Sequence, residues 1–208
     1  ISSKEKQPAG PGSQTLVGIA RAFPTRQRLN ENAPLARYVQ STLQTFDFFA
    51  VHGSILVSLQ DTIVERANHG VKFRVLLMDH GDANVQNLKE YGRVQFPATS
   101  IERLQQMPGE SIDVLKSIHQ RIDNASGGSF EFRFVPFQFL NSFWVRDAGY
   151  PSALAHLEIT AYRPTNPNIT NPSVRFGALC PEMIESLHLQ FEGLWPLGTE
   201  RQSLLSAK

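Results

Sequence analysis

The sequence predicts one α/β domain built on a mixed, largely parallel central sheet with helices on both faces. The first observation behind this prediction is a βαβ unit. Residues 46–51 and 71–78 are apolar runs that suit strands buried on both faces. Between them, apolar side chains recur at helical spacing over residues 54–67, and Gly70 follows as a stop. The second observation is that the strands after residue 129 come as a run, which adds antiparallel strands to a parallel core.

The remaining elements follow from periodicity and turn residues. An alternating pattern places Phe130, Phe132 and Phe134 on one face of a half-exposed or edge strand. A helix over residues 99–122 is expected to be split at Met107-Pro108-Gly109. The other predicted elements are strands at 15–23, 139–147 and 153–162, helices at 32–45, 82–91 and 181–195, and a loop at 164–172.

The domain is predicted to span residues 14–197. Residues 1–13 carry Pro, Gly, Ser and Lys without an apolar pattern, which is typical of a linker or tail, and residues 198–208 form a polar tail. Because the chain begins with Ile1, we expect it to be a piece of a longer protein with a further domain upstream.

Composition narrows the class of protein. The net charge of +1 lacks the basic footprint of a dedicated nucleic-acid module, although it leaves a single anionic ligand open. The single cysteine, Cys180, excludes an intramolecular disulfide and a cysteine-based zinc site. No apolar run reaches the roughly 18 residues of a membrane span, so we expect a cytoplasmic protein without a membrane partner. The common glycine-rich nucleotide motifs and the Gly-x-Ser-x-Gly and His-Glu-x-x-His hydrolase motifs are also absent.

Polar residues at strand ends are the first candidates for a site. His52 and Ser54 stand where a strand leads into a helix, with Ser54 predicted as the N-cap, and such a helix end favours an anion or is an ordinary cap. Asp79 and His80 follow the neighbouring parallel strand, so they should lie near His52. Two histidines and an aspartate could bind a metal, but the short ligand spacing is missing, so a hydrogen-bonded polar rim is favoured and no metal is predicted.

Later strands add a second group of candidates. His156 and Glu158 are two residues apart and therefore share a strand face, either as a binding or catalytic pair or as a histidine oriented by a carboxylate. Arg146 ends a strand and could clamp a phosphate or carboxylate, or pair with Asp147. Further anion candidates, each also typical of a solvated charge, are Arg26, Arg28, Arg133, Arg163 and Arg175.

Several segments in this order resemble the phospholipase D-like superfamily. They are GIARAFP, the helix leading into FDFFAVHGS, GVKFRVLLMD, the pair SFWVRD and ALAHLEITAY, and FEGLW, over about residues 15–196. The similarity is greatest to single-copy domains that bacterial proteins carry behind a regulatory or DNA-binding module. Active members carry His-x-Lys-x-x-x-x-Asp, in which the histidine is the nucleophile and the lysine holds the phosphate. This chain keeps His156 but has Glu158 at the lysine position and Arg163 at the aspartate position.

The inverted charges imply a degenerate site, because a carboxylate repels a phosphodiester and favours a protonated histidine. The resemblance implies a non-catalytic sensor or interaction domain that binds a small phosphate-containing anion or a partner at the strand carboxyl ends, without a cofactor. One alternative is an active phosphodiesterase or nuclease that uses His156 as nucleophile. Another is a structural dimerisation domain, since superfamily members often pair two halves and a homodimer is therefore expected. The implied pocket residues are His52, Ser54, Asp79, His80, Arg146, His156, Glu158 and Arg163.

Overall fold

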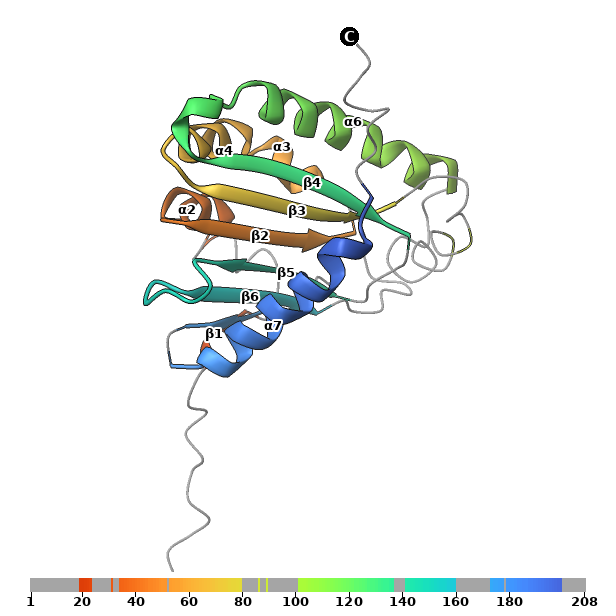
Figure 1. The fold of residues 1–208 in the computed structure, drawn as a ribbon. Coiled ribbons are helices and arrows are strands. Elements are labelled where there is room, and N and C mark those ends of the chain that lie inside the picture. The colour runs from red at the N-terminus through yellow and green to blue at the C-terminus, as the bar shows by residue number, and fades with distance from the viewer. Residues whose placement is uncertain are drawn as a thin grey trace, which may run out of the picture.

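A computed structural model describes residues 19–23, 31, 34–51, 53–79, 86, 89, 101–136, 141–159, 173–177 and 179–199. Its strands form one seven-stranded sheet in the order β1-β7-β6-β5-β2-β3-β4 (Figure 1). The strands are β1 (Ile19–Phe23), β2 (Thr45–Ala50), β3 (Lys72–Met78), β4 (Ser129–Val135), β5 (Asn141–Arg146), β6 (Leu154–Ile159) and β7 (Ser173–Phe176). The helices are α2 (Leu35–Gln40), α3 (Ser54–Val57), α4 (Gln60–Ala67), α6 (Ile101–Gln120) and α7 (Pro181–Leu194), with short 3₁₀ turns η2 (Asn124–Ser126) and η3 (Trp195–Leu197).

The sheet is mixed, but the prediction that it is largely parallel is wrong. Only β2, β3 and β4 run parallel to one another. The other four neighbouring pairs are antiparallel, namely β2 with β5, β5 with β6, β6 with β7 and β7 with β1. A parallel pair needs a long crossover, which the helices α3, α4 and α6 supply. Residues 147–153, which join β5 to β6, are too few for such a crossover, so these two strands pair antiparallel.

The βαβ unit is confirmed, with two differences in its helix. β2 and β3 pair in parallel from Thr45 opposite Lys72 to Ala50 opposite Leu77. The helix between them is divided into α3 and α4, because the Leu59 N–H bonds to the Leu56 carbonyl at 3.0 Å and tightens the chain there. Gly53, rather than Ser54, occupies the N-cap of α3. The structure thus contradicts the predicted capping role of Ser54.

Other elements differ from the prediction in extent. The backbone of α6 continues as one helix through residues 107–109, where a break was expected. A proline inside a helix costs about 3 kcal/mol, and the fully buried Leu115 and Ile118 anchor this helix to the core. β7 was not predicted, and α2 is shorter than expected. The helix expected at 82–91 and the loop at 164–172 fall largely or wholly outside the described residues.

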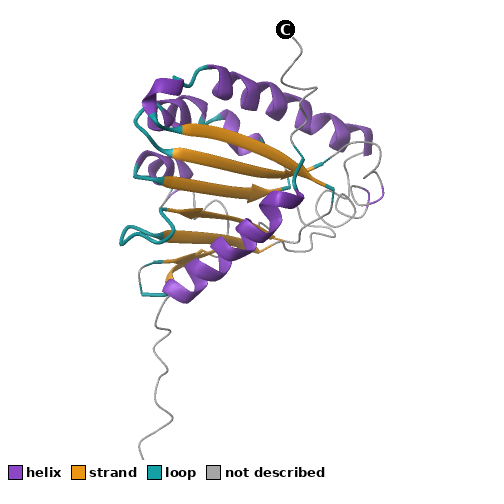
Figure 2. Cartoon of the chain, viewed as in Figure 1, coloured by secondary structure: helices purple, strands orange, loops and turns teal. Residues whose placement is uncertain are grey.

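The sheet lies between two layers of helices, as predicted (Figure 2). One core packs α2, α3, α4 and α6 against Phe46, Phe48, Phe73 and Val75. The other core lies under α7, where Phe191 packs with Phe49 and Phe143. Among the helices of the described residues, none is long and apolar enough to cross a membrane. Each sheet face therefore has its own core, and polar side chains on the two faces belong to separate sites.

Candidate functional site

Two of the predicted site residues lie at the carboxyl edge of the parallel strands. Ser54 begins α3 directly after β2. Asp79 follows β3, and its backbone N–H donates to the Val135 carbonyl at 2.7 Å. The other predicted residues of this edge and of the family motif, His52, His80 and Arg163, lie outside the described residues.

His156 and Glu158 on β6 share a sheet face, as their spacing predicts. His156 lies opposite Trp144 of β5 and Arg175 of β7. Its imidazole is fully buried and stacks on Trp144, with ring centroids 4.0 Å apart and planes 15° apart. Glu158 is 4% exposed. It lies two residues beyond His156 on β6, nearer to the edge of the sheet at which β2 ends. Both side chains are therefore part of the packed face on the α2 side of the sheet.

Arg146 lies at the opposite edge from Asp79 and Ser54. It pairs with Phe46 near the start of β2, because β5 runs antiparallel to β2. Arg146 is four positions along β5 from Ser142, the partner of Glu158, which amounts to about 13 Å. The structure therefore does not bring Arg146 into one pocket with Asp79 and Ser54.

Arg146 instead belongs to a group of arginines around Tyr38 of α2. The guanidinium carbon of Arg175 lies 3.8 Å from the Tyr38 ring centroid, and that of Arg146 lies 5.3 Å from it. Arg21 of β1 is the Cα partner of Arg175, and both guanidinium groups contact the ring of Phe23. We call Arg21, Arg146 and Arg175 the arginine group. It gathers three positive charges on the α2 face of the antiparallel strands.

Burial disfavours the positive charge of two members of this group. Burial, followed by repulsion from Arg21, lowers the pKa of Arg175 to about 10. Burial also lowers the pKa of Arg146, although the nearby Asp147 carboxylate opposes this shift. An anion bound beside these groups would stabilise their charged form, so the group favours anionic ligands electrostatically.

Several buried polar atoms beside the arginine group have no hydrogen-bond partner within the described part of the protein. Within the described part of the chain, the Tyr38 hydroxyl, the Arg146 Nε and the Trp144 Nε1 are buried and make no hydrogen bond. Arg146 does donate through Nη1 to the Ser41 hydroxyl. Because nearly all buried polar groups in proteins are hydrogen-bonded, three such donors on one face require an acceptor from ordered water or from a ligand. A ligand rich in oxygen atoms would meet that requirement.

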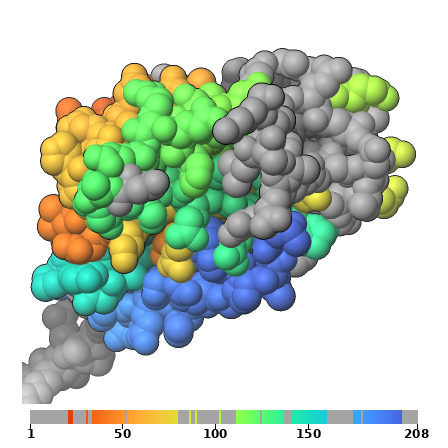
Figure 3. Space-filling view, turned by 45° about the horizontal axis from the view of Figure 1, so that its top comes forward, coloured from red at the N-terminus to blue at the C-terminus, as the bar shows by residue number. Residues whose placement is uncertain are grey.

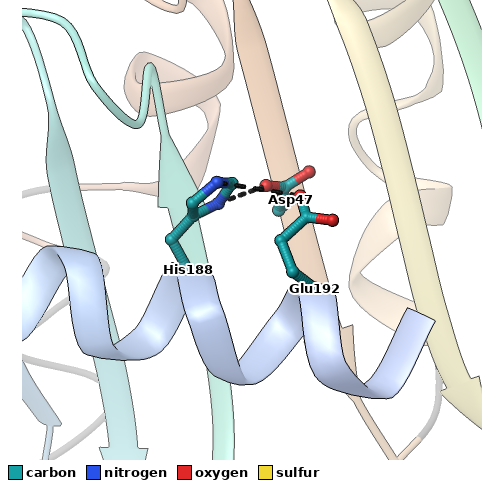
Figure 4. A group of neighbouring side chains, drawn as sticks. All are labelled: Asp47, His188 and Glu192. Atoms are coloured by element: carbon teal, nitrogen blue, oxygen red, sulfur yellow. Dashed lines mark ion pairs between the residues drawn. The ribbon is translucent and has the colours of Figure 1, made fainter. Parts of the chain in front are cut away.

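The opposite face carries a second cluster of charges, which sequence reasoning missed. Asp47 of β2, 1% exposed, accepts hydrogen bonds from Arg74 Nε at 2.8 Å and Nη2 at 2.9 Å. From α7, Glu192 accepts from Arg74 Nη2 at 2.6 Å, and His188 Nδ1 lies 3.3 Å from Asp47 Oδ2 (Figure 4). The available signal was an aspartate in the middle of the apolar run FDFFA, since a buried charge requires a partner.

This cluster is an ion-pair network rather than a metal centre. Asp47, His188 and Glu192 offer ligand atoms within 4.8 Å of one another. However, the Arg74 guanidinium already bridges the two carboxylates and takes the place that a cation would need. Burial opposes the charge on Arg74, but its hydrogen bonds to Asp47 and Glu192 raise the pKa overall. The Asp47 carboxylate beside His188 likewise raises the pKa of that imidazole.

Comparisons with known proteins give structural likenesses only. No protein-family model and no curated protein matches the chain in sequence. Among solved structures, TrmBL2, an archaeal chromatin protein with a novel mode of DNA binding, aligns with a TM-score of 0.47 and 13% identity over 89% of this chain. The chain spans 55% of the length of that protein. Nuc from Salmonella typhimurium, a phospholipase D family member, aligns with a TM-score of 0.44 and 13% identity over 79% of this chain and 86% of its own. At such scores neither likeness says what this chain binds.

Proposed function

We propose that this domain binds a small phosphate-containing anion at the arginine group, on the α2 face of the antiparallel strands. The observation that carries the proposal is the pair Arg146 and Arg175, two half-buried guanidinium groups that contact one tyrosine ring and whose charge burial disfavours. Guanidinium groups bind phosphate oxygens through paired hydrogen bonds. The unsatisfied Tyr38 hydroxyl would supply a further donor.

The proposed activity is binding without hydrolysis. A histidine nucleophile must reach the phosphorus atom, whereas His156 is fully buried and stacked on Trp144. Glu158 lies two residues away and carries a negative charge. Active members of the phospholipase D-like superfamily, which this chain resembles, carry a lysine at that position. We therefore favour a sensor or interaction domain of a larger protein over a phosphodiesterase.

Titration calorimetry with inorganic phosphate and phenyl phosphate tests this binding. We expect Arg175→Gln to weaken binding by about tenfold or more, since a charge-assisted hydrogen bond contributes about 1.5–3 kcal/mol. Arg37→Gln is the matched control, because Arg37 lies beside Tyr38 on α2 but is exposed. Binding should also weaken as salt is raised. No heat of binding with either phosphate, or equal losses in both variants, would overturn the proposal.

A hydrolysis assay separates binding from catalysis. The protein is incubated with bis-p-nitrophenyl phosphate, and we expect no release of nitrophenol above background. Turnover that disappears in the His156→Ala variant would contradict the non-catalytic assignment and favour the phosphodiesterase alternative. An unchanged phosphate affinity in that variant would support the arginine group as the binding element.

A further inference from the structure

A cavity of about 510 Å³ lies on the α7 face of the sheet, between the β5–β6 turn and the first half of α7. Its volume falls within the range of small-molecule sites. Figure 3 shows α7 in blue, running beside the teal β5–β6 segment that forms the other wall. The walls are largely apolar, with Ala148, Tyr150 and Pro151 from the turn and Ile184 and Leu189 from the helix.

Two charged or titratable side chains enter this apolar lining, Glu185 and His188 of α7. Behind His188 stand the buried Asp47 carboxylate and the more exposed side chains of Glu192 and Arg74. Three carboxylates and one guanidinium thus surround His188, so the local formal charge is −2 with a neutral imidazole and −1 with a protonated one. The negative charge remains in either protonation state, which disfavours an anionic ligand.

An aromatic ring stands at the rim of the same cavity. Tyr150 lines the cavity and is 48% exposed, so its side chain is accessible to a ligand from solvent. An ammonium group over the face of such a ring is attracted by the negative potential of its π-electrons. The cavity therefore combines a carboxylate, an exposed ring and an apolar body within one small-molecule volume.

We propose that this cavity binds a small organic amine, with its ammonium group between Glu185 and the Tyr150 ring and its apolar body against Ile184 and Leu189. This site is on the opposite sheet face from the arginine group, so it stands independently of the proposed anion binding. His188 makes the affinity depend on pH, because its protonation adds a positive charge to the wall. The nearby Asp147 carboxylate is engaged by the backbone N–H groups of Leu43, Gln44 and Thr45.

Calorimetry with three molecules of similar size tests the amine assignment. The probes are phenethylamine, 2-phenylethanol and 3-phenylpropionate, which carry a positive, neutral and negative group on one aromatic body. We expect phenethylamine to bind about tenfold or more tightly than 3-phenylpropionate, and more tightly at pH 8 than at pH 6. Equal affinity for the three probes, or no binding of phenethylamine at millimolar concentration, would overturn the proposal.

Variants of three side chains that line the cavity locate the site. We expect Glu185→Gln to weaken phenethylamine binding by about two- to fivefold, the range of an exposed ion pair, and Tyr150→Ala to weaken it by about two- to fivefold. Glu182→Gln on the same helix is the matched control, because Glu182 is exposed and does not line the cavity. Replacing His188 by Gln should remove the pH dependence. Binding that none of the three site variants alters lies elsewhere and refutes the assignment.

Discussion

At the scale of single residues, the Asp47 carboxylate of β2 links Arg74 of β3 to His188 of α7. It is 1% exposed and accepts two hydrogen bonds from Arg74, whose side chain is 22% exposed. We expect Asp47→Asn to lower the free energy of unfolding by about 2–4 kcal/mol, since breaking a buried pair leaves the other charge uncompensated. Urea unfolding at neutral pH measures this loss.

The matched control for Asp47 is Glu192, the other carboxylate on Arg74. Its side chain is 42% exposed, so water replaces it readily. We expect Glu192→Gln to change the free energy of unfolding by less than about 1 kcal/mol. A loss as large as that of Asp47→Asn would mean that the network acts as a single unit rather than through its buried member.

His188 gives the same network a dependence on pH. The Asp47 carboxylate beside it, followed by the charge of Glu192, raises its pKa against the opposing effects of burial and Arg74. A group with a raised folded-state pKa stabilises the fold fully below its unfolded value of about 6.5, and this contribution is lost as pH rises through the folded pKa. The stability of the native chain relative to His188→Gln should therefore fall as pH increases above about 6.5. Parallel unfolding curves of the two proteins across pH 5 to 9 check this, and a rise instead of a fall would contradict it.

At element scale, local patterns predicted the βαβ unit, the Phe-rich edge strand and α7, because each depends on spacing within one segment. β7 was not predicted, because its four residues, Ser173–Phe176, are too few to show an alternation of apolar and polar side chains. The mixture of parallel and antiparallel strands was predicted, but the share of antiparallel pairs was underestimated, because pairing depends on which distant strand lies beside β2 and no local pattern encodes that β5 does.

The junction between the βαβ unit and β4 leaves no room for a side chain at Gly128. A Cβ there would lie 2.0 Å from the Ala67 carbonyl oxygen and 2.7 Å from that of Val71, both backbone atoms at the α4–β3 connection. We expect Gly128→Ala to destabilise the protein by about 3 kcal/mol or more, as measured by thermal or urea unfolding.

Gly193 in α7 provides the contrasting substitution. Nothing lies within 4 Å of a Cβ built there, and the residue is exposed. Gly193→Ala should therefore stabilise the protein by about 0.5–1 kcal/mol, through the ordinary helix preference of alanine. Losses of similar size in both variants would argue against a specific clash at Gly128.

At the scale of the whole molecule, the sites depend on contacts between distant segments. Alternation along one strand predicted that His156 and Glu158 share a face. The arginine group, in contrast, joins β1, β5 and β7, and the α7 cavity joins a hairpin turn to the last helix. Arg175 was a candidate from sequence, but its closeness to Arg21 and Tyr38 follows only from the strand order.

The two tryptophans report on the two layers of the molecule separately. Trp144 packs in the core under α2, α3, α4 and α6, and Trp195 packs beside Phe191 in the core under α7. Both layers share one sheet, whose strands contribute side chains to both cores, so we expect the protein to unfold in a single cooperative transition.

In the Trp144→Phe and Trp195→Phe variants, the remaining tryptophan fluorescence and the far-ultraviolet circular dichroism should give the same urea midpoint within each variant. A fluorescence midpoint that differs from the dichroism midpoint in either variant would show that one helix layer detaches before the sheet unfolds. Since α7 carries both the His188 contact to Asp47 and one wall of the cavity, early loss of that layer would also abolish amine binding before the arginine group is affected.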